Sequence, residues 1–185
     1  MVHYKLLYFH FRVIPFDCWS TQKPNMPFEK VPVLEVDGKP IAQSYAILIF
    51  GQRIRISRKT SWDQAKIDEF SDVQKDLHHE VVIYQRVCLG VVQGDKEKLY
   101  NETFVPAMKQ YLPVYVKTLK ESGSGYLMNC GLTWVDFTVA NFLTTVKNLH
   151  PEELEKFPDL EEYRQRIYSL PSLQNYLKNR KPSIV

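Results

Sequence analysis

The side chains that could take part in chemistry are concentrated in the first fifty residues. Tyr8 lies near the end of an aromatic-rich stretch, and a phenol at that position can donate a hydrogen bond to a thiolate. Holding the anion lowers a thiol's pKa from about 8.5 towards neutrality, so more of the nucleophile is present. The ordinary alternative is that Tyr8 is one aromatic among 11 tyrosines.

Pro32 lies between Val31 and Val33 in a strand-like stretch. Because proline cannot donate to a sheet ladder, it must occupy the first residue of that strand. A cis bond there would turn the Val31 backbone outward and leave its N–H and C=O available to a peptide ligand. The alternative is an ordinary trans proline at a strand start.

Gln43 and Ser44 precede an apolar helical pattern, so they place an amide, a hydroxyl and free N–H groups at a helix start. That combination suits a ligand carboxylate, because helix N-termini attract anions. A plain N-cap at Ser44 is the alternative. Trp19 and Lys23 add a stacking face and a cation in a loop.

Several classes of function are disfavoured. The net charge is +3 and the basic residues form no stripe, which argues against nucleic acid. Three separated cysteines without a CxxC argue for a reducing compartment and against a dithiol redox centre. No signal peptide or membrane span is expected. No metal is expected either, because His78, His79 and Glu80 are consecutive and point apart on a helix.

The first part of the chain has the pattern of strands. Residues 3–11 predict an opening strand, and 31–36 predict a second one. The sequence DGK at 37–39 predicts a hairpin turn, and 40–43 a short return strand. Ser44 then predicts the N-cap of a helix.

The second part is helical. Apolar residues recur at three-to-four spacing from residue 60, with a capping box expected at Ser61 and Gln64. Residues 96–122 predict one long helix that GSG ends, with Pro106 and Pro113 bending it or marking its first turns. Three more helices are expected over residues 132–149, 158–170 and 171–179, the last two opened by prolines.

The order of these patterns is more specific than any of them alone. An opening YKLLYF, then VPVLEVDG, AQS and a helical half with LTWVDF closely resembles cytosolic glutathione transferases, most nearly the sigma-like type of nematodes. The resemblance covers nearly the whole chain. It implies a thioredoxin-like α/β domain over residues 1–57 and an all-helical domain over 61–185. It also implies a cytoplasmic homodimer that acts in detoxification.

The resemblance also implies roles for residues of the first strand and the loop after it. Tyr8 matches the tyrosine that hydrogen-bonds the glutathione sulfur, and Arg12 matches an arginine that supports the site. Trp19 and Lys23 match the pair that contacts the glycine end of glutathione.

Further matches follow along the chain. Val31 and Pro32 match the backbone clamp on the cysteinyl unit and its cis-proline, and Gln43 with Ser44 match the pair that binds the γ-glutamyl carboxylate. Asp72 matches an acidic residue that reaches across the dimer to the γ-glutamyl amine. Thr133 and Asp136 match the family's capping box, which serves folding and not catalysis.

The sequence departs from the family in three places. Lys30 replaces a glutamine; an ammonium only donates hydrogen bonds, so affinity for glutathione could change. Only seven residues, RVIPFDC, separate Phe11 from Trp19, too few for a helix and a strand. The first helix and second strand are therefore missing or shortened, or the sequence joins segments across residues that it omits. Gly51 and two β-branched residues weaken the helix over 50–57.

Two functions remain open on the sequence. One is a glutathione transferase that joins the glutathione thiolate to apolar electrophiles near Tyr84 and Val87, with peroxidase or prostaglandin isomerase activity as variants. The other is a non-catalytic carrier or structural protein on the same scaffold, which Lys30 and the short segment favour. A thiol-disulfide oxidoreductase is disfavoured, since Cys18 has no CxxC partner.

Overall fold

The computed structural model describes residues 3–7, 18–55 and 60–179, and the chain divides into two compact units. The first lies within Met1–Ser57 and carries the strands; the second lies within Arg58–Lys178 and is helical. This is the α/β unit followed by an all-helical unit that the sequence predicts. Among the described residues of both units, no helix is long and apolar enough to cross a membrane.

The first unit is built on a three-stranded antiparallel sheet in the order β1 (Tyr4–Leu7), β2 (Val33–Val36), β3 (Lys39–Ala42). The β2–β3 hairpin turns at Asp37 and Gly38, whose φ angles of 48° and 79° define a type I′ turn. The predicted DGK hairpin is therefore confirmed. Within the described residues β1 pairs only with β2. The family's first helix and second strand, which the sequence predicts to be missing or shortened, would fall in residues 8–17, which the structure does not describe.

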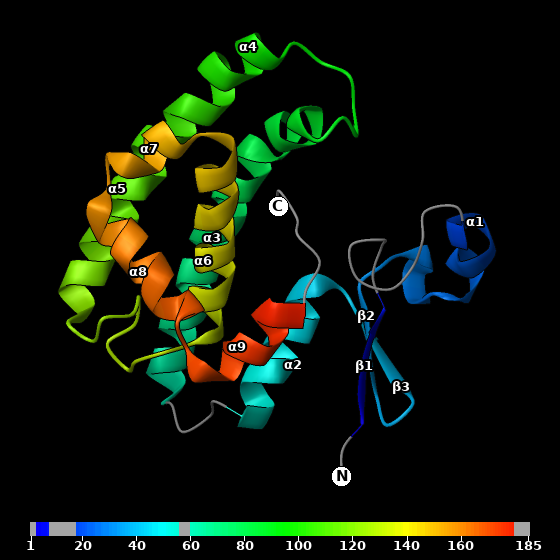
Figure 1. Cartoon of the computed structure of the whole chain (residues 1–185). Helices are drawn as coiled ribbons and strands as arrows, with labels where there is room; N and C mark the ends of the chain where they lie inside the picture. Colours follow the sequence, from blue (N-terminus) through cyan, green and yellow to red (C-terminus); the bar gives the residue numbers. More distant parts are fainter. Residues whose placement is uncertain (1–2, 8–17, 56–59, 180–185) are drawn as a thin grey trace. The chain divides into compact units, whose positions relative to one another are not determined.

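Helices lie on both faces of this sheet (Figure 1). On one face is α2 (Ser44–Arg55); on the other are α1 (Trp19–Gln22) and two 3₁₀ turns, Lys23–Asn25 and Pro27–Glu29. The expectation of a weakened helix over residues 50–57 stays a prediction: α2 continues to Arg55 despite Gly51, and residues 56–57 lie outside the described part of the chain. Packing of α2 against the sheet outweighs the low helix propensity of glycine and isoleucine.

The second unit begins with α3 (Ser61–Cys88), which is capped one residue earlier than expected. Thr60 and Asp63 form the capping box in place of Ser61 and Gln64, because Thr60 is the last extended residue. The predicted apolar face of α3 is buried at Ile67, Phe70, Leu77, Val81 and Tyr84, whereas Val73 is only half-buried.

The expected helix over residues 96–122 is divided. It consists of α4 (Lys96–Leu99), a π turn at Tyr100–Phe104 and α5 (Val105–Ser122). Pro106 stands in the first turn of α5, and Pro113 lies inside it on the exposed side, where water can satisfy the freed carbonyl. Gly123, with φ of 62°, ends α5 in the left-handed conformation, as GSG predicts.

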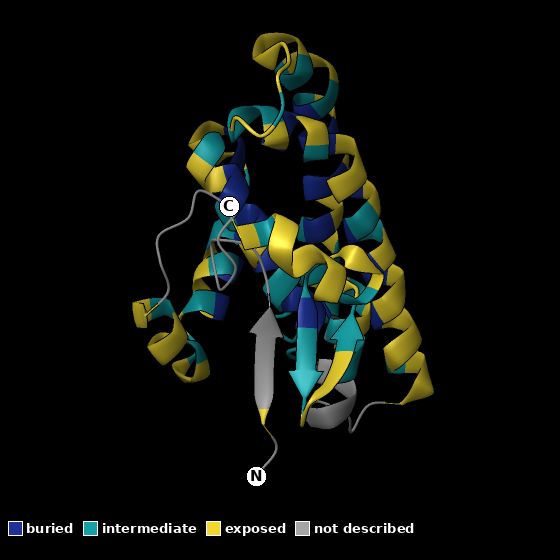
Figure 2. Ribbon diagram, turned by 90° about the vertical axis from the view of Figure 1, so that its right-hand side faces the viewer, coloured by how far each residue is buried: buried dark blue, intermediate teal, exposed yellow. Residues whose placement is uncertain are grey.

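Four helices complete the second unit: α6 (Trp134–Leu149), α7 (Pro151–Glu155), α8 (Pro158–Tyr168) and α9 (Pro171–Asn179). The sequence predicts all but the one-turn α7. The Thr133–Asp136 capping box opens α6 as expected. The buried residues of this unit gather on the inward faces of its helices (Figure 2), and α6 supplies the largest share of them.

Candidate functional site

The hairpin β2–β3 brings two pairs of expected site residues to one end of the sheet. Val33 pairs with Ala42, so Val31–Pro32 and Gln43–Ser44 leave the hairpin at the same end, opposite the Asp37–Gly38 turn. Leu7, the last residue of β1, pairs with Val33 and so reaches this end too. The end of β1 and the two ends of the hairpin thus meet at one end of the sheet.

The peptide bond between Val31 and Pro32 is cis, as the resemblance implies. Pro32 precedes the first residue of β2, so its missing N–H costs the sheet no hydrogen bond. Val31 is half-buried, and within the described residues its N–H and C=O have no backbone partner. A ligand in extended form could pair with those groups.

The N-cap of α2 lies one residue earlier than the sequence predicts. Ser44 is the first helical residue and not the N-cap. Gln43 takes the capping position, with φ of 75°, and its carbonyl accepts the first intrahelical bond from the Ile47 N–H at 3.0 Å. Gln43 and Ser44 are both exposed, and the free N–H groups of the helix start lie beside them.

The remaining expected residues of the first unit lie before β2. Trp19 opens α1 and is half-buried, and Lys23 begins the following 3₁₀ turn. The Lys23 ammonium lies 3.4 Å from the Glu29 carboxylate. Lys30 is exposed and ends the second 3₁₀ turn. Tyr8 and Arg12 lie outside the described residues.

Asp72 belongs to the other unit. It is exposed on α3 and pairs with Lys75 at 2.7 Å. Tyr84, expected near an apolar substrate, is fully buried and packs its ring against Phe104 at 4.9 Å between centroids. Tyr84 has no exposed surface with which to contact a substrate, whereas Val87 is half-buried, and the expected location of the second substrate near them stays a prediction.

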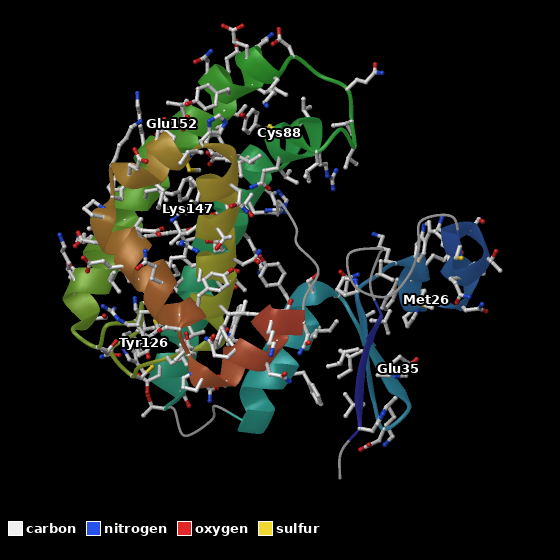
Figure 3. All side chains as sticks on the ribbon, viewed as in Figure 1. Met26, Glu35, Cys88, Tyr126, Lys147 and Glu152 are labelled. Carbon is white, nitrogen blue, oxygen red and sulfur yellow. The ribbon has the colours of Figure 1, made fainter. Side chains whose placement is uncertain are left out.

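Sequence reasoning missed a cavity of about 390 Å³ in the first unit. Its walls are mainly Met26, Pro27, Val33, Glu35 and Pro40, and Met26 and Glu35 are labelled in Figure 3. The one available signal was that Val33 and Glu35, two apart in a strand, share a face of the sheet. None of the expected site residues that the structure describes lines this cavity. The described residues also contain no group of three or more His, Cys, Asp or Glu placed to hold a metal ion.

Comparison with known proteins agrees with this arrangement. The family model of the glutathione S-transferase N-terminal domain matches residues 4–50, and that of the C-terminal domain matches residues 75–180. The chain belongs to the glutathione S-transferase family, and its relatives place it in the nematode type. Its first unit is the thioredoxin-like half of that fold.

Three relatives illustrate the likeness. A probable glutathione S-transferase 9 of Caenorhabditis elegans is 32% identical over 201 residues, which cover 97% of this chain and 98% of the relative. The Ascaris lumbricoides enzyme structure shares 30% identity and a TM-score of 0.90, covering 99% of this chain and all of its own. The monomeric Na-GST-3 of Necator americanus shares 32% identity and a TM-score of 0.87 over 98% of both chains.

The lengths of these alignments bear on the short segment after the first strand. The alignment with the Caenorhabditis elegans relative spans 201 positions, although this chain has 185 residues. The relative therefore contains residues that this chain lacks. If the segment between Arg12 and Trp19 is shortened, this chain should have fewer residues than its relatives, which agrees with the lengths.

Proposed function

We propose that this protein conjugates the thiolate of glutathione to an electrophilic carbon of an apolar second substrate. One observation carries the proposal: the N-terminal family model matches residues 4–50. That stretch contains every residue expected to touch glutathione within one subunit, from Tyr8 to Ser44. Curated relatives that match nearly the whole chain are named glutathione S-transferases.

The proposed chemistry needs only a stabilised thiolate and proximity. The glutathione thiol loses its proton to solvent, and the Tyr8 hydroxyl donates to the resulting sulfur anion, which lowers the thiol's pKa from about 8.5. The sulfur then forms a bond to the electrophilic carbon, and the leaving group departs with its electron pair. Binding both reactants side by side supplies the rest of the rate enhancement.

Glutathione would lie along the edge where the two hairpin ends meet. The Val31 backbone pairs with the cysteinyl unit, and Gln43 with Ser44 binds the γ-glutamyl carboxylate at the start of α2. Trp19 and Lys23 hold the glycine end, and Lys30 donates to the backbone of the ligand. For Lys23 to do so it must leave Glu29, which costs at most about 1 kcal/mol because the pair is exposed.

Further parts of the proposal concern location and assembly. Arg12 supports the site, and Asp72 of a second subunit reaches the γ-glutamyl amine, which requires a homodimer. The domain limits 1–57 and 61–185, the cytoplasmic location and the role in detoxification belong to the same proposal. Because one similar structure is described as monomeric, the molar mass in solution is the direct test of the dimer.

The test measures the rate at which the wild-type protein and the variants Tyr8→Phe and Tyr4→Phe conjugate glutathione to a chromogenic aryl halide. Tyr8→Phe should lower kcat/KM about 10²-fold by removing the hydrogen bond to the thiolate. Tyr4→Phe changes the same residue type in β1 and should keep turnover within about twofold, because such a hydroxyl loss costs little away from the reacting atoms. Equal losses in the two variants would contradict the role of Tyr8.

A second candidate is a non-catalytic carrier, which Lys30 and the short segment after Phe11 favour. Retention on immobilised glutathione without turnover of any electrophile would support it. A prostaglandin D synthase of Nilaparvata lugens shares the fold at 24% identity, a likeness that concerns the scaffold alone. Hydroperoxides and prostaglandin H are therefore further substrates for the turnover assay, and neither is favoured.

A further inference from the structure

The cavity of the first unit lies between the sheet and the turns that precede β2. Val33 and Glu35 are two residues apart on β2, so both side chains point to the same face of the sheet. Pro40 of β3 is paired with Glu35 in the strand register and therefore belongs to that face too. The other wall comes from Met26 and Pro27 of the turn segment, and Met26 and Glu35 are labelled in Figure 3. Two separate stretches of the chain thus form the cavity.

The wall that the turn segment forms is held by backbone hydrogen bonds. The Met26 N–H donates to the Lys23 carbonyl at 3.1 Å, and the Glu29 N–H donates to the Met26 carbonyl at 2.9 Å. The turn Pro27–Glu29 packs against β3. Its first residue is a proline, whose ring fixes the φ angle. A ligand would therefore lose little binding energy to the ordering of this wall.

The walls suit an apolar body. Met26, Val33 and Pro40 present apolar groups to the cavity, and the flexible thioether of Met26 makes favourable contacts with aromatic rings. Val33 is buried, so the deepest part of the lining is apolar. The volume of about 390 Å³ falls within the range of ordinary small-molecule sites. A ligand of one or two rings matches these dimensions.

The polar part of the lining carries a negative charge. Glu35 is the only charged side chain among the described residues that line the cavity, and the Asn25 amide is the only other polar one. A carboxylate accepts hydrogen bonds and donates none, and the Asn25 carbonyl is a further acceptor. An ammonium group carries three donors. The lining therefore complements a cation and repels an anion.

Lys5 moderates this charge. In the β1–β2 register the residue opposite Glu35 is Lys5. A lysine opposite a carboxylate can pair with it, so a ligand ammonium has to compete. Such a pair near the surface is worth little, so the competition should weaken a cationic ligand at most about fivefold.

We propose that this cavity is a binding site for small organic cations, molecules that join an apolar ring system to a protonated amine. The amine donates to the Glu35 carboxylate and to the Asn25 carbonyl. The rings lie against Met26, Val33 and Pro40. The described residues expected to hold glutathione do not line the cavity, and the test uses no glutathione. The proposal therefore stands or falls independently of the transferase proposal.

The experiment compares three indole ligands that share one ring system and differ in the end group: tryptamine, tryptophol and indole-3-propionate. Amide chemical shifts of the full chain, followed by NMR, give both the Kd and the place of binding. Tryptamine should shift the amides of Val33, Glu35 and Gly38 with a Kd of about 1 mM or tighter, as expected for about 12 non-hydrogen atoms. Tryptophol should bind about fivefold more weakly, and indole-3-propionate more weakly again.

Two results would overturn the proposal at this stage. Equal affinities for tryptamine and tryptophol would show that the charge is not used. Shifts confined to amides outside β2, β3 and the turn segment would show that tryptamine binds elsewhere.

Two variants test the role of the charge. Glu35→Gln keeps the size of the side chain and should weaken tryptamine about fivefold, while tryptophol stays within about twofold. Lys5→Gln removes the competing cation and should tighten tryptamine about threefold. The control is Glu29→Gln, because Glu29 is exposed, pairs with Lys23 and does not line the cavity. It should change neither Kd by more than about twofold.

The neutral ligand separates loss of charge from loss of structure. If Glu35→Gln binds tryptophol normally, the cavity is intact, and unchanged tryptamine binding in that variant would contradict the proposal. If Glu35→Gln loses both ligands, Lys5→Gln decides, because weaker or unchanged tryptamine binding there would contradict a negatively charged site.

Discussion

The Tyr163 hydroxyl of α8 donates a 2.9 Å hydrogen bond to Oδ1 of Asp136 in the first turn of α6. The same carboxylate accepts from the Leu127 N–H at 2.9 Å and, through Oδ2, from the N–H and hydroxyl of Thr133. Asp136 is fully buried, and these donors belong to three residues of the helical unit, Leu127, Thr133 and Tyr163. One carboxylate therefore joins the N-terminus of α6 to the loop before it and to α8.

Replacing Asp136 with alanine should lower the free energy of unfolding by about 3–5 kcal/mol, because several buried donors would lose their acceptor together. Urea denaturation of the full chain measures the loss. The control is Asp159→Asn, which removes only the exposed pair with Lys120 and should cost under about 1 kcal/mol. A loss in Asp136→Ala no larger than in the control would contradict the structural role.

Glu161 gives a prediction for pH. Hydrogen bonds from Arg164, and also from Lys147 and Gln165, lower its pKa to about 2 although partial burial opposes this. A lowered folded-state pKa stabilises the fold above the unfolded value, and this contribution disappears as pH falls through the folded value. Glu161→Gln should therefore cost about 1–2 kcal/mol at pH 7, allowing for partial exposure.

The difference between wild type and Glu161→Gln should shrink between pH 5 and pH 2, the range bounded by the ordinary glutamate pKa of 4.5 and the lowered one. Urea titrations at several pH values measure it. Glu162→Gln, an exposed neighbour on α8, should show no such trend. A pH-independent difference for Glu161→Gln would mean that its charge does not stabilise the fold.

Gly38 tests the hairpin that brings the two backbone segments together. Its φ is 79°, and an added Cβ would meet no heavy atom within 4 Å, so Gly38→Ala changes the backbone energy alone. We expect a cost of about 1–2 kcal/mol, seen as faster hydrogen exchange at the β2 and β3 amides. Asp37→Asn keeps an acceptor for the His3 N–H and tolerates positive φ, so exchange should stay near the wild-type rate. Unchanged exchange in Gly38→Ala would contradict the type I′ turn.

Lys30→Gln tests the departure from the family pattern. A glutamine amide can donate to and accept from a peptide backbone, whereas the ammonium only donates. One additional hydrogen bond of about 1 kcal/mol should tighten glutathione binding roughly fivefold, measured by calorimetry. Lys39→Gln removes an equal charge on β3 and should leave Kd unchanged. Weaker binding in Lys30→Gln would show that the charge itself is used.

Local patterns predict those elements whose signals need few neighbours. The DG turn, the glycine stop of α5 and the Thr133–Asp136 box each depend on residues within one turn, and each is confirmed. The capping box of α3 is misplaced by one residue, because Thr60 and Ser61 both suit an N-cap. Packing then decides which one is the last extended residue.

Sequence alone determined the family, the order of the strands and of the longer helices, and the residues expected to hold glutathione, because turn chemistry, caps and apolar spacing are written in short stretches. Only the folded chain decided that Tyr84 is buried against Phe104 and joined to His150, 66 residues away. It likewise decided that a cavity opens beside Glu35. Such contacts depend on how separate elements pack, and no local pattern encodes the partner that a side chain meets across a core.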